Sequence, residues 1–201
     1  MEAATARKRF GADSEIRDRN AKACTKLQCL YSERSRMPKK IDPLNKKQYG
    51  AVSVAITVAD IKAAANFYQK ALGFTKRGMM NGPDKKPIHA ELRLRDTTLM
   101  LGPENPAGGR SAKTLGGSPV TLYLLTENSD KVVAKAVKLG ATLVAPVSDR
   151  FWGDRVGIIA DPDGNTWMIA THTAELAPQE MNKKMKEEIQ AQAAAQPAVG
   201  A

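Results

Sequence analysis

The side chains best suited to acid–base or metal chemistry are the two histidines and the carboxylate near one of them. His89 and Glu91 are two residues apart, which places them on one face of a strand, and His172 ends a later strand-like stretch. Imidazole and carboxylate groups bind zinc, but the chain has only these two histidines and nothing in the spacing brings them together. We therefore interpret His89, Glu91 and His172 as a surface or interface ion set in preference to a metal site.

The segment Phe-Trp-Gly-Asp-Arg at residues 151–155 is a second candidate for chemistry. Trp152 offers an apolar wall, and Arg155 offers a forked donor for an anion at the edge of a pocket. Alternatively, Asp154 and Arg155 pair with their own surroundings and brace the loop. The sequence leaves both interpretations open.

Residues 53–74 predict a strand followed by a helix, the first of the elements that must position these groups. From Ser53 to Val58, small or polar residues alternate with branched apolar ones, as in a half-buried strand. Asp60 stands at a helix N-cap position, and Gly73 ends the helical spacing of apolar residues. Two further strands are predicted at 91–95 and 98–101.

The same order of elements returns later in the chain at a constant offset of 68 residues. The predicted elements are strands at 120–125, 156–160 and 166–170, a helix starting at 128–130 and ending at Gly140, and a turn at 161–164. The offset carries Asp60 to Asn128 and Met100 to Met168. A constant offset through cap, helix and strand indicates two copies of one supersecondary unit.

The net charge of +10 is concentrated near the N-terminus, where residues 1–50 hold 13 Lys and Arg against 6 Asp and Glu. Residues 1–48 have almost no apolar periodicity, and the basic run at residues 7–9 has no interleaved aromatic residues, so we expect a basic, disordered arm and not a nucleic-acid-binding element. Its acidic residues disfavour an organellar transit peptide, although that targeting stays a minority alternative. Both cysteines, Cys24 and Cys29, lie in this arm, and the absence of a disulfide framework elsewhere favours the cytoplasm.

We expect the rest of the chain to form one folded domain and a short tail. The domain covers 49–174, with repeats at about 51–104 and 119–172, and residues 175–201 form a helix and a flexible end. No stretch approaches the roughly 18 uninterrupted apolar residues of a membrane-spanning helix.

Several motifs resemble those of one family. Residues 58–74 read V-x-D-I-x-A-A-x-x-F-Y-x-x-x-L-G-F, and F-W-G-D-R, D-P-D-G-N-T-W and A-T-H follow at 151–155, 161–167 and 170–172. With the 68-residue offset, they resemble the glyoxalase, bleomycin-resistance and extradiol-dioxygenase family, the vicinal oxygen chelate superfamily, and its phosphonate-operon-associated branch. The resemblance implies an α+β fold in which two tandem βαβββ units form a curved mixed sheet around a cup.

The resemblance also assigns four positions at which family members bind a divalent metal in the cup. These positions are Ser53 and Thr121 in the first strand of each unit, and Met100 and Met168 in the last. A neutral hydroxyl is a weak ligand and a thioether is a soft one, so this set does not suit an oxophilic cation. We therefore expect neither a metal nor another cofactor.

Strand alternation predicts which other side chains share the cup face. Residues two apart point the same way, so Thr57 and Tyr123 join the four positions above, while the apolar residues between them face the helices. The expected ligand pocket comprises Ser53, Thr57, Glu91, Met100, Thr121, Tyr123, Trp152, Arg155, Met168 and His172. In the alternative interpretation, Met100 and Met168 fill the cup as adaptable core residues.

We predict that the chain binds a small organic ligand in the cup between its repeats without a metal, as the drug-sequestering members of the family do. One alternative is a glyoxalase-like enzyme, of lyase, isomerase or dioxygenase ancestry, that uses Glu91, Tyr123 or His172 as acid or base. Another is an interaction protein that acts through the basic arm. The resemblance also implies a homodimer, and Glu91, Arg93 and Arg95 offer charges that can pair across a two-fold axis. Membrane and nucleic acid are not expected partners.

Overall fold

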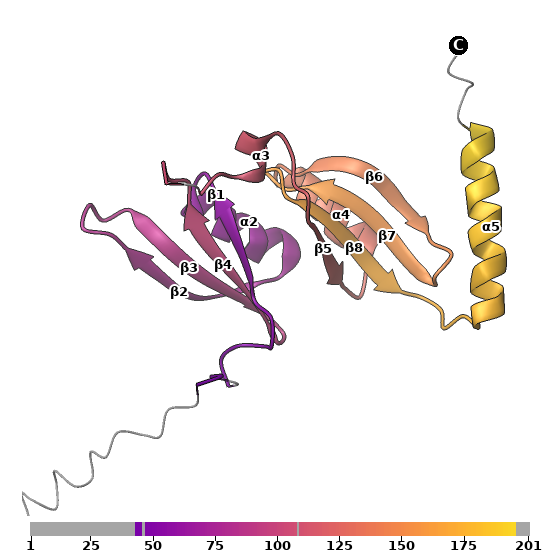
Figure 1. Ribbon diagram of the computed structural model, residues 1–201, viewed down its shortest axis with the longest axis horizontal. Helices are drawn as coiled ribbons and strands as arrows, with labels where there is room; N and C mark the ends of the chain where they lie inside the picture. The colour runs from indigo at the N-terminus through magenta and orange to yellow at the C-terminus, as the bar shows by residue number, and fades with distance from the viewer. Residues whose placement is uncertain (1–42, 46, 108, 196–201) are drawn as a thin grey trace, which may run out of the picture. The chain divides into compact units, whose positions relative to one another are not determined.

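The computed structural model describes residues 43–45, 47–107 and 109–195 (Figure 1). The chain divides into two units, 1–46 and 47–201, and every helix and strand given below belongs to the second. The predicted basic arm lies almost wholly outside the described residues. Within the described ranges, no helix has both the length and the apolar content of a membrane span.

Two four-stranded sheets with the same internal order make up the domain (Figure 1). The first sheet contains β1 (Val54–Val58), β2 (Thr75–Asn81), β3 (Pro87–Leu94) and β4 (Thr97–Pro103), with α2 (Ile61–Leu72) after β1. The second contains β5 (Thr121–Leu125), β6 (Thr142–Asp149), β7 (Asp154–Ala160) and β8 (Thr166–His172), with α4 (Ser129–Lys138) after β5. The short helix α3 (Ala112–Leu115) precedes β5, and α5 (Pro178–Ala195) follows β8.

The strand orders β1-β4-β3-β2 and β5-β8-β7-β6 are identical in topology. In each sheet the first and last strands of the unit run parallel, and the other neighbours are antiparallel. The fold is therefore α+β, with two tandem βαβββ units and curved mixed sheets, as predicted.

Local sequence explains where the helices begin. The Asp60 carboxylate accepts hydrogen bonds from the backbone N–H groups of Lys62 and Ala63, and the Asn128 side chain accepts one from Lys131. These bonds satisfy donors that the first helical turn leaves free. The equivalent caps lie at the predicted offset in the two repeats.

The core lies between the helices and one face of each sheet. Leu99, Leu101, Trp167 and Ile169 are buried in it, as the alternation predicts, together with Tyr68 of α2. The rings of Tyr68 and Trp167, from different repeats, have centroids 5.6 Å apart. A single core therefore joins the two repeats.

The loop between β7 and β8 also connects the repeats, through the buried carboxylate of Asp161. Its Oδ2 accepts hydrogen bonds from the Tyr68 hydroxyl at 2.6 Å and from the Trp167 indole at 2.9 Å. Its Oδ1 accepts from the backbone N–H groups of Asp163 and Asn165 at 3.0 and 2.9 Å. Burial, followed by the charge of Asp161, raises the pKa of Tyr68 well above its ordinary value, so the phenol stays a donor. We call this arrangement the Asp161 staple.

The strands β2 and β6 were not predicted from the residues themselves. Both lie at sheet edges, and most of their side chains are exposed or half-buried. Their pairing registers shift, between Lys76 and Gly78 in β2 and between Leu143 and Ala145 in β6. Such irregularities remove the clean alternation that marks a half-buried strand.

Candidate functional site

Of the four positions assigned to a metal, Met100, Thr121 and Met168 lie in β4, β5 and β8, and Ser53 directly precedes β1. Met100 pairs with Ala55 across β4 and β1, and Met168 pairs with Tyr123 across β8 and β5. Both methionines are half-buried, while their strand neighbours Leu99 and Trp167 are buried on the opposite, helix-facing side. We call the side that carries Met100 and Met168 the cup face of each sheet.

These residues do not fit the metal that the family implies. Thioether sulfur and neutral hydroxyl oxygen form a poor donor set for an oxophilic divalent cation. Among the described residues, no three His, Cys, Asp or Glu side chains gather in a way that could hold a metal ion. No chemical step is therefore assigned to a metal here.

The predicted pocket residues divide between the two sheets. Ser53, Thr57, Glu91 and Met100 belong to the first repeat, and Thr121, Tyr123, Trp152, Met168 and His172 to the second. Thr121 and Tyr123 line one of five cavities in the described residues, and His172 lines another, whereas Ser53, Thr57, Glu91, Met100 and Met168 line none of these five. None of these five cavities therefore joins the two groups.

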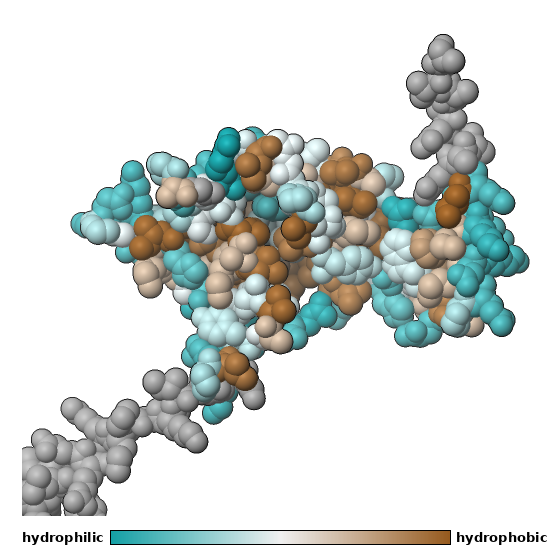
Figure 2. Space-filling model, in the orientation of Figure 1, coloured by the Kyte–Doolittle hydropathy of each residue, from teal (hydrophilic) through white to brown (hydrophobic). Residues whose placement is uncertain are grey.

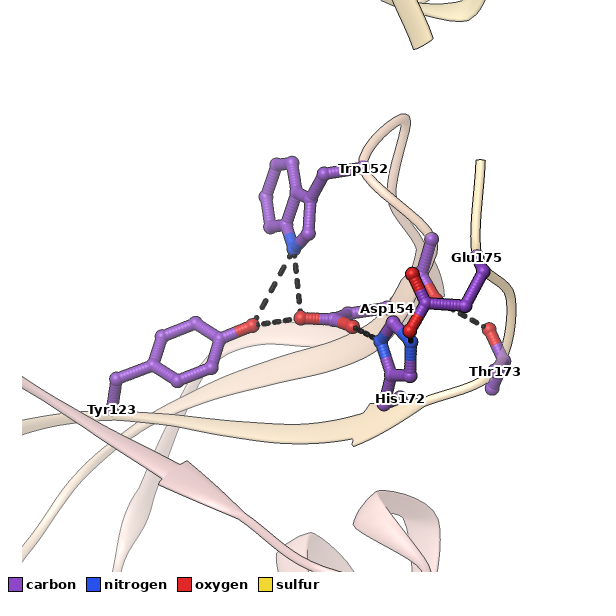
Figure 3. Close-up of polar contacts among 7 residues, drawn as sticks. Tyr123, Trp152, Asp154, His172, Thr173 and Glu175 are labelled. Carbon is purple, nitrogen blue, oxygen red and sulfur yellow. Dashed lines mark hydrogen bonds and ion pairs between the residues drawn. The ribbon is translucent and has the colours of Figure 1, made fainter. Parts of the chain in front are cut away.

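The second cup face carries a connected polar cluster (Figure 3). At its centre, Asp154 accepts hydrogen bonds at Oδ2 from the Tyr123 hydroxyl and, at 3.0 Å, from the Trp152 indole. Its Oδ1 contacts Nδ1 of His172 at 2.7 Å, and Nε2 of His172 contacts Glu175 at 3.1 Å. We call Tyr123, Trp152, Asp154 and His172 the Asp154 cluster.

Strand register explains why these side chains meet. Asp154 and His172 are directly opposite each other on β7 and β8 and so share a face. Tyr123 pairs with Met168, which precedes His172 by four residues on the same face of β8. The Asp154 side chain is only 11% exposed, whereas that of His172 is 49% exposed. The cluster therefore presents an imidazole to solvent above a shielded carboxylate.

Electrostatics favour the charged forms of both partners. Desolvation tends to raise the pKa of Asp154, but hydrogen bonds from Tyr123, His172 and Trp152 outweigh it, and the pKa is lowered overall. Hydrogen bonds to Asp154 and then to Glu175 raise the pKa of His172. Burial, and next the bond to Asp154, raises the pKa of Tyr123, which keeps its hydroxyl protonated.

We expect the His172 ring to titrate above its ordinary value of 6.5. A raised folded-state pKa means that the ion pair stabilises the fold fully below that ordinary value and that this contribution is lost as the pH rises through the raised one. NMR titration of the His89→Gln chain, in which His172 is the only histidine, measures it directly. Adding Asp154→Asn should lower the midpoint. An unchanged midpoint would show that Asp154 does not hold the imidazolium.

The first cup face carries a different set around Glu91. Its carboxylate accepts a hydrogen bond from the Tyr49 hydroxyl at 2.7 Å and lies 3.4 Å from the Arg77 guanidinium and 3.6 Å from His89. The bond from Tyr49, ahead of the bond from His89 and the charge of Arg77, lowers the pKa of Glu91 against the opposing effect of desolvation. A carboxylate with a lowered pKa and several donors is poorly suited to act as a general acid or base near neutral pH.

The structure corrects the expected position of Arg155. In β7 it follows Asp154, so its side chain leaves the opposite face of the sheet and pairs with Thr171, not with His172. Its guanidinium binds Asp130 of α4 through two hydrogen bonds of 2.8 and 2.9 Å and Asp149 through one of 3.1 Å. Arg155 therefore braces β7 against α4, which is the alternative interpretation of the F-W-G-D-R segment.

The loop that carries Trp152 is held from two sides. The Gly153 carbonyl accepts hydrogen bonds from the backbone N–H groups of Thr173 and Ala174 at 2.9 and 3.0 Å. Glu188 of α5 binds the Arg150 side chain at 3.1 Å and the Phe151 backbone N–H at 3.3 Å. The role of Glu188 was not predictable from the sequence, because its partners lie 37 and 38 residues away and no local pattern indicates such contacts.

Comparison with known proteins gives the family. The model of the Glyoxalase/Bleomycin resistance protein/Dioxygenase superfamily matches residues 50–169. The uncharacterized protein Rv0887c of Mycobacterium tuberculosis is 38% identical over 139 residues, which cover 67% of this chain and 82% of that protein. The protein At5g48480 of Arabidopsis thaliana is 30% identical over 114 residues, covering 53% of this chain and 69% of that protein.

Solved structures agree with this assignment. The Arabidopsis thaliana At5g48480 structure has a TM-score of 0.50 and 27% identity, and the match covers 61% of this chain and 98% of that one. TioX from Micromonospora sp. ML1 has a TM-score of 0.50 and 18% identity with the same coverage, so it shares the fold. The phosphonate-operon-associated branch stays a prediction. Sequence and structure together place the chain in the Glyoxalase/Bleomycin resistance protein/Dioxygenase superfamily.

Proposed function

We propose that the chain binds a small organic ligand at the cup face of the second repeat, without a metal. The observation that carries the proposal is the Asp154 cluster, in which an exposed imidazole and an aromatic side chain are held in place by one shielded carboxylate. Such preorganised polar groups beside aromatic and thioether surface are typical of small-molecule sites. Family membership supports the proposal, since the family includes drug-sequestering proteins.

The charges of the cluster indicate the class of ligand. The raised pKa of His172 favours an imidazolium, and its outer partner, Glu175, has a side chain that is 95% exposed. A ligand carboxylate can take the place of Glu175 on Nε2, while Trp152, Tyr123 and Met168 contact an apolar or aromatic body. The proposed ligand therefore has one anionic or strongly polar end, as the sequence predicted, with His172 in the role first given to Arg155.

A thermal-shift screen of the full chain with metal salts and aromatic carboxylates such as 1-naphthoate tests this function. A ligand that binds only the folded state increases the free energy of unfolding by about 2.7 kcal/mol when its free concentration is a hundred times Kd. The melting temperature rises as a result. We expect a carboxylate to do so, and EDTA to leave the melting temperature unchanged. Stoichiometric metal retained after chelation would contradict the metal-independent part of the proposal.

Variants of the cluster give a sharper test with the ligand found. His172→Gln removes a charge-assisted hydrogen bond and should weaken binding roughly tenfold to a hundredfold. Trp152→Ala should weaken it through lost apolar contact. Arg155→Met is the matched control, because Arg155 lies on the opposite face and should leave the affinity unchanged. If Arg155→Met weakens binding and His172→Gln does not, the proposed site is wrong.

We also propose a homodimer, in which the first cup face of one copy meets the second cup face of the other. Two observations support it: none of the five cavities joins the two groups within one chain, and the exposed side chain of Tyr123 lies on the second cup face. A dimer would bring the two cup faces together and complete a cup. Analytical ultracentrifugation at micromolar concentration should give twice the chain mass, and a monomer would remove the proposal.

A second candidate is acid–base catalysis by His172. An imidazole oriented by a carboxylate through one nitrogen is a common arrangement for a general acid or base, and Tyr123 adds a protonated hydroxyl nearby. Turnover of the ligand found in the screen, followed by NMR, distinguishes an enzyme from a binding protein. For an enzyme, the rate should follow the His172 titration and disappear in His172→Gln.

Two further expectations concern the basic arm, which lies almost wholly outside the described residues, and the cellular location. An interaction through the basic arm concerns residues 1–48 and stays an alternative, which a chain shortened by these residues would test through loss of partner binding. Cytoplasmic location stays a proposal that rests on the position of the two cysteines.

A further inference from the structure

A cavity of about 350 Å³ lies between the two repeats, along strand β5. On the first-repeat side it is bounded by the turn from Leu94 to Thr97, and its lining includes the core residues Phe74, Leu99 and Trp167. Figure 2 shows apolar surface in this middle part of the molecule. The size and the mainly apolar lining fall within the range of small-molecule pockets, roughly 300 to 1,000 Å³.

Arg95 stands at this cavity in an unusual backbone conformation. It is one of the two residues that connect β3 to β4, and its φ is 53°. Positive φ in such short hairpin turns is normally taken by Gly or Asn, because a longer side chain strains the backbone there. The turn places the cationic side chain of Arg95 at the cavity.

The charge of Arg95 is not neutralised within the described part of the chain. Its Nη2 donates a hydrogen bond to the Leu125 carbonyl of β5, across the gap between the repeats. Among the ion pairs of the described residues, none involves Arg95. A carbonyl is a weaker partner for a guanidinium than a carboxylate, so an anion that enters the cavity can replace it.

A second cavity, of about 650 Å³, shares Leu94, Arg95, Leu124 and Leu125 with the first. The contact between Arg95 and Leu125 therefore stands where the two cavities meet. Asp96 also lines the first cavity, and its carboxylate disfavours a ligand with more than one negative charge.

We propose that this inter-repeat cavity binds a small amphipathic molecule, with one anionic group on Arg95 and an aromatic or aliphatic body against Phe74, Leu99 and Trp167. The site differs from the cup-face site described above in its anion partner, which is Arg95 of the first repeat and not His172. Tyr123 borders both sites and is left out of the test for that reason.

Fluorescence titration of the full chain with 8-anilinonaphthalene-1-sulfonate, an anionic aromatic probe, tests the proposal. The uncharged N-phenyl-1-naphthylamine is the matched probe. We expect one sulfonate probe to bind per chain. Arg95→Met should weaken the binding of the sulfonate probe roughly tenfold to a hundredfold and change the binding of the uncharged probe little. Asp96→Asn, which removes the neighbouring negative charge, should not weaken binding of the sulfonate probe. Leu122→Trp narrows the cavity and should weaken the binding of both probes.

Arg95→Gly keeps the test valid if Arg95→Met folds poorly. Glycine adopts positive φ without strain, so this variant should fold at least as well as the parent chain and still lose the affinity for the sulfonate. If the Arg95 variants lose affinity for both probes equally, or for neither, the proposal is overturned. It is also overturned if His172→Gln weakens binding of the sulfonate probe, because the probe would then lie at the Asp154 cluster. Probe release that follows chain association would show that a second copy fills the cavity, and would overturn it too.

Discussion

Replacing Asp161 with asparagine is expected to lower the free energy of unfolding by about 3 to 5 kcal/mol, since each buried donor left without an acceptor costs about 1 to 3 kcal/mol. The Asp161 carboxylate accepts hydrogen bonds from the Tyr68 hydroxyl, the Trp167 indole and two backbone N–H groups. An amide nitrogen in place of either oxygen would face donors and leave them unpaired. Chemical denaturation followed by circular dichroism measures the loss.

Two variants frame this result. Tyr68→Phe removes one donor to the same carboxylate and should cost about 1.5 to 3 kcal/mol, less than Asp161→Asn. Asp149→Asn makes the same chemical change at a side chain that is 78% exposed and should cost no more than about 1 kcal/mol. Similar losses for Asp149→Asn and Asp161→Asn would show that the staple contributes no special stability.

Replacing Gly153 with alanine is expected to cost about 2 to 4 kcal/mol of stability and to weaken ligand binding together with it. Gly153 has a φ of 95°, and a Cβ atom there would run into the backbone carbonyl oxygen of Ala174. The hydrogen bonds from the backbone N–H groups of Thr173 and Ala174 to the Gly153 carbonyl join the Trp152 loop to the segment after His172. Relief of the clash must therefore move Trp152 or the end of β8, and both carry the Asp154 cluster.

Gly117→Ala is the matched control for Gly153→Ala. A Cβ atom at Gly117 would meet no other atom within 4 Å, and its φ lies outside the range that disfavours side chains. We expect its stability to change by less than about 1 kcal/mol, with ligand affinity unchanged. A Gly153→Ala chain that keeps both parental stability and affinity would show that the loop tolerates displacement, and would contradict this account of the site.

The repeated elements were predictable because their signals are local. Alternation at 53–58, the Asp60 cap and the 68-residue offset each depend on neighbours in sequence, and β1, α2, β5 and α4 appear where these signals placed them. The irregular edge strands β2 and β6 lack such a signal, because shifted registers and solvent exposure remove the apolar alternation. Only the family resemblance supplied them.

The sequence predicted several residues of the candidate site but not the contacts that join them. Tyr123, Trp152 and His172 were selected from the sequence, and the structure brings all three to Asp154. Arg155 was placed on the wrong side because the motif was treated as a loop, whereas β7 already begins at Asp154 and alternation turns the next residue away. Because side chains alternate along a strand, an extension of β7 back to Asp154 places Arg155 on the face opposite to Asp154.

The Asp161 staple bears on how a duplicated chain diverges. If the two repeats were still interchangeable, the contact would also occur in the reverse direction, between the residues 68 positions away. Those residues are Ala136, in place of a second tyrosine, and Arg93, in place of a second aspartate. Neither can form the bond, so the contact runs in one direction only, from Tyr68 of the first repeat to Asp161 of the second. Exchanging one repeat for a copy of the other would therefore remove the hydrogen bond between Tyr68 and Asp161. The stability that this bond contributes depends on the presence of both repeats.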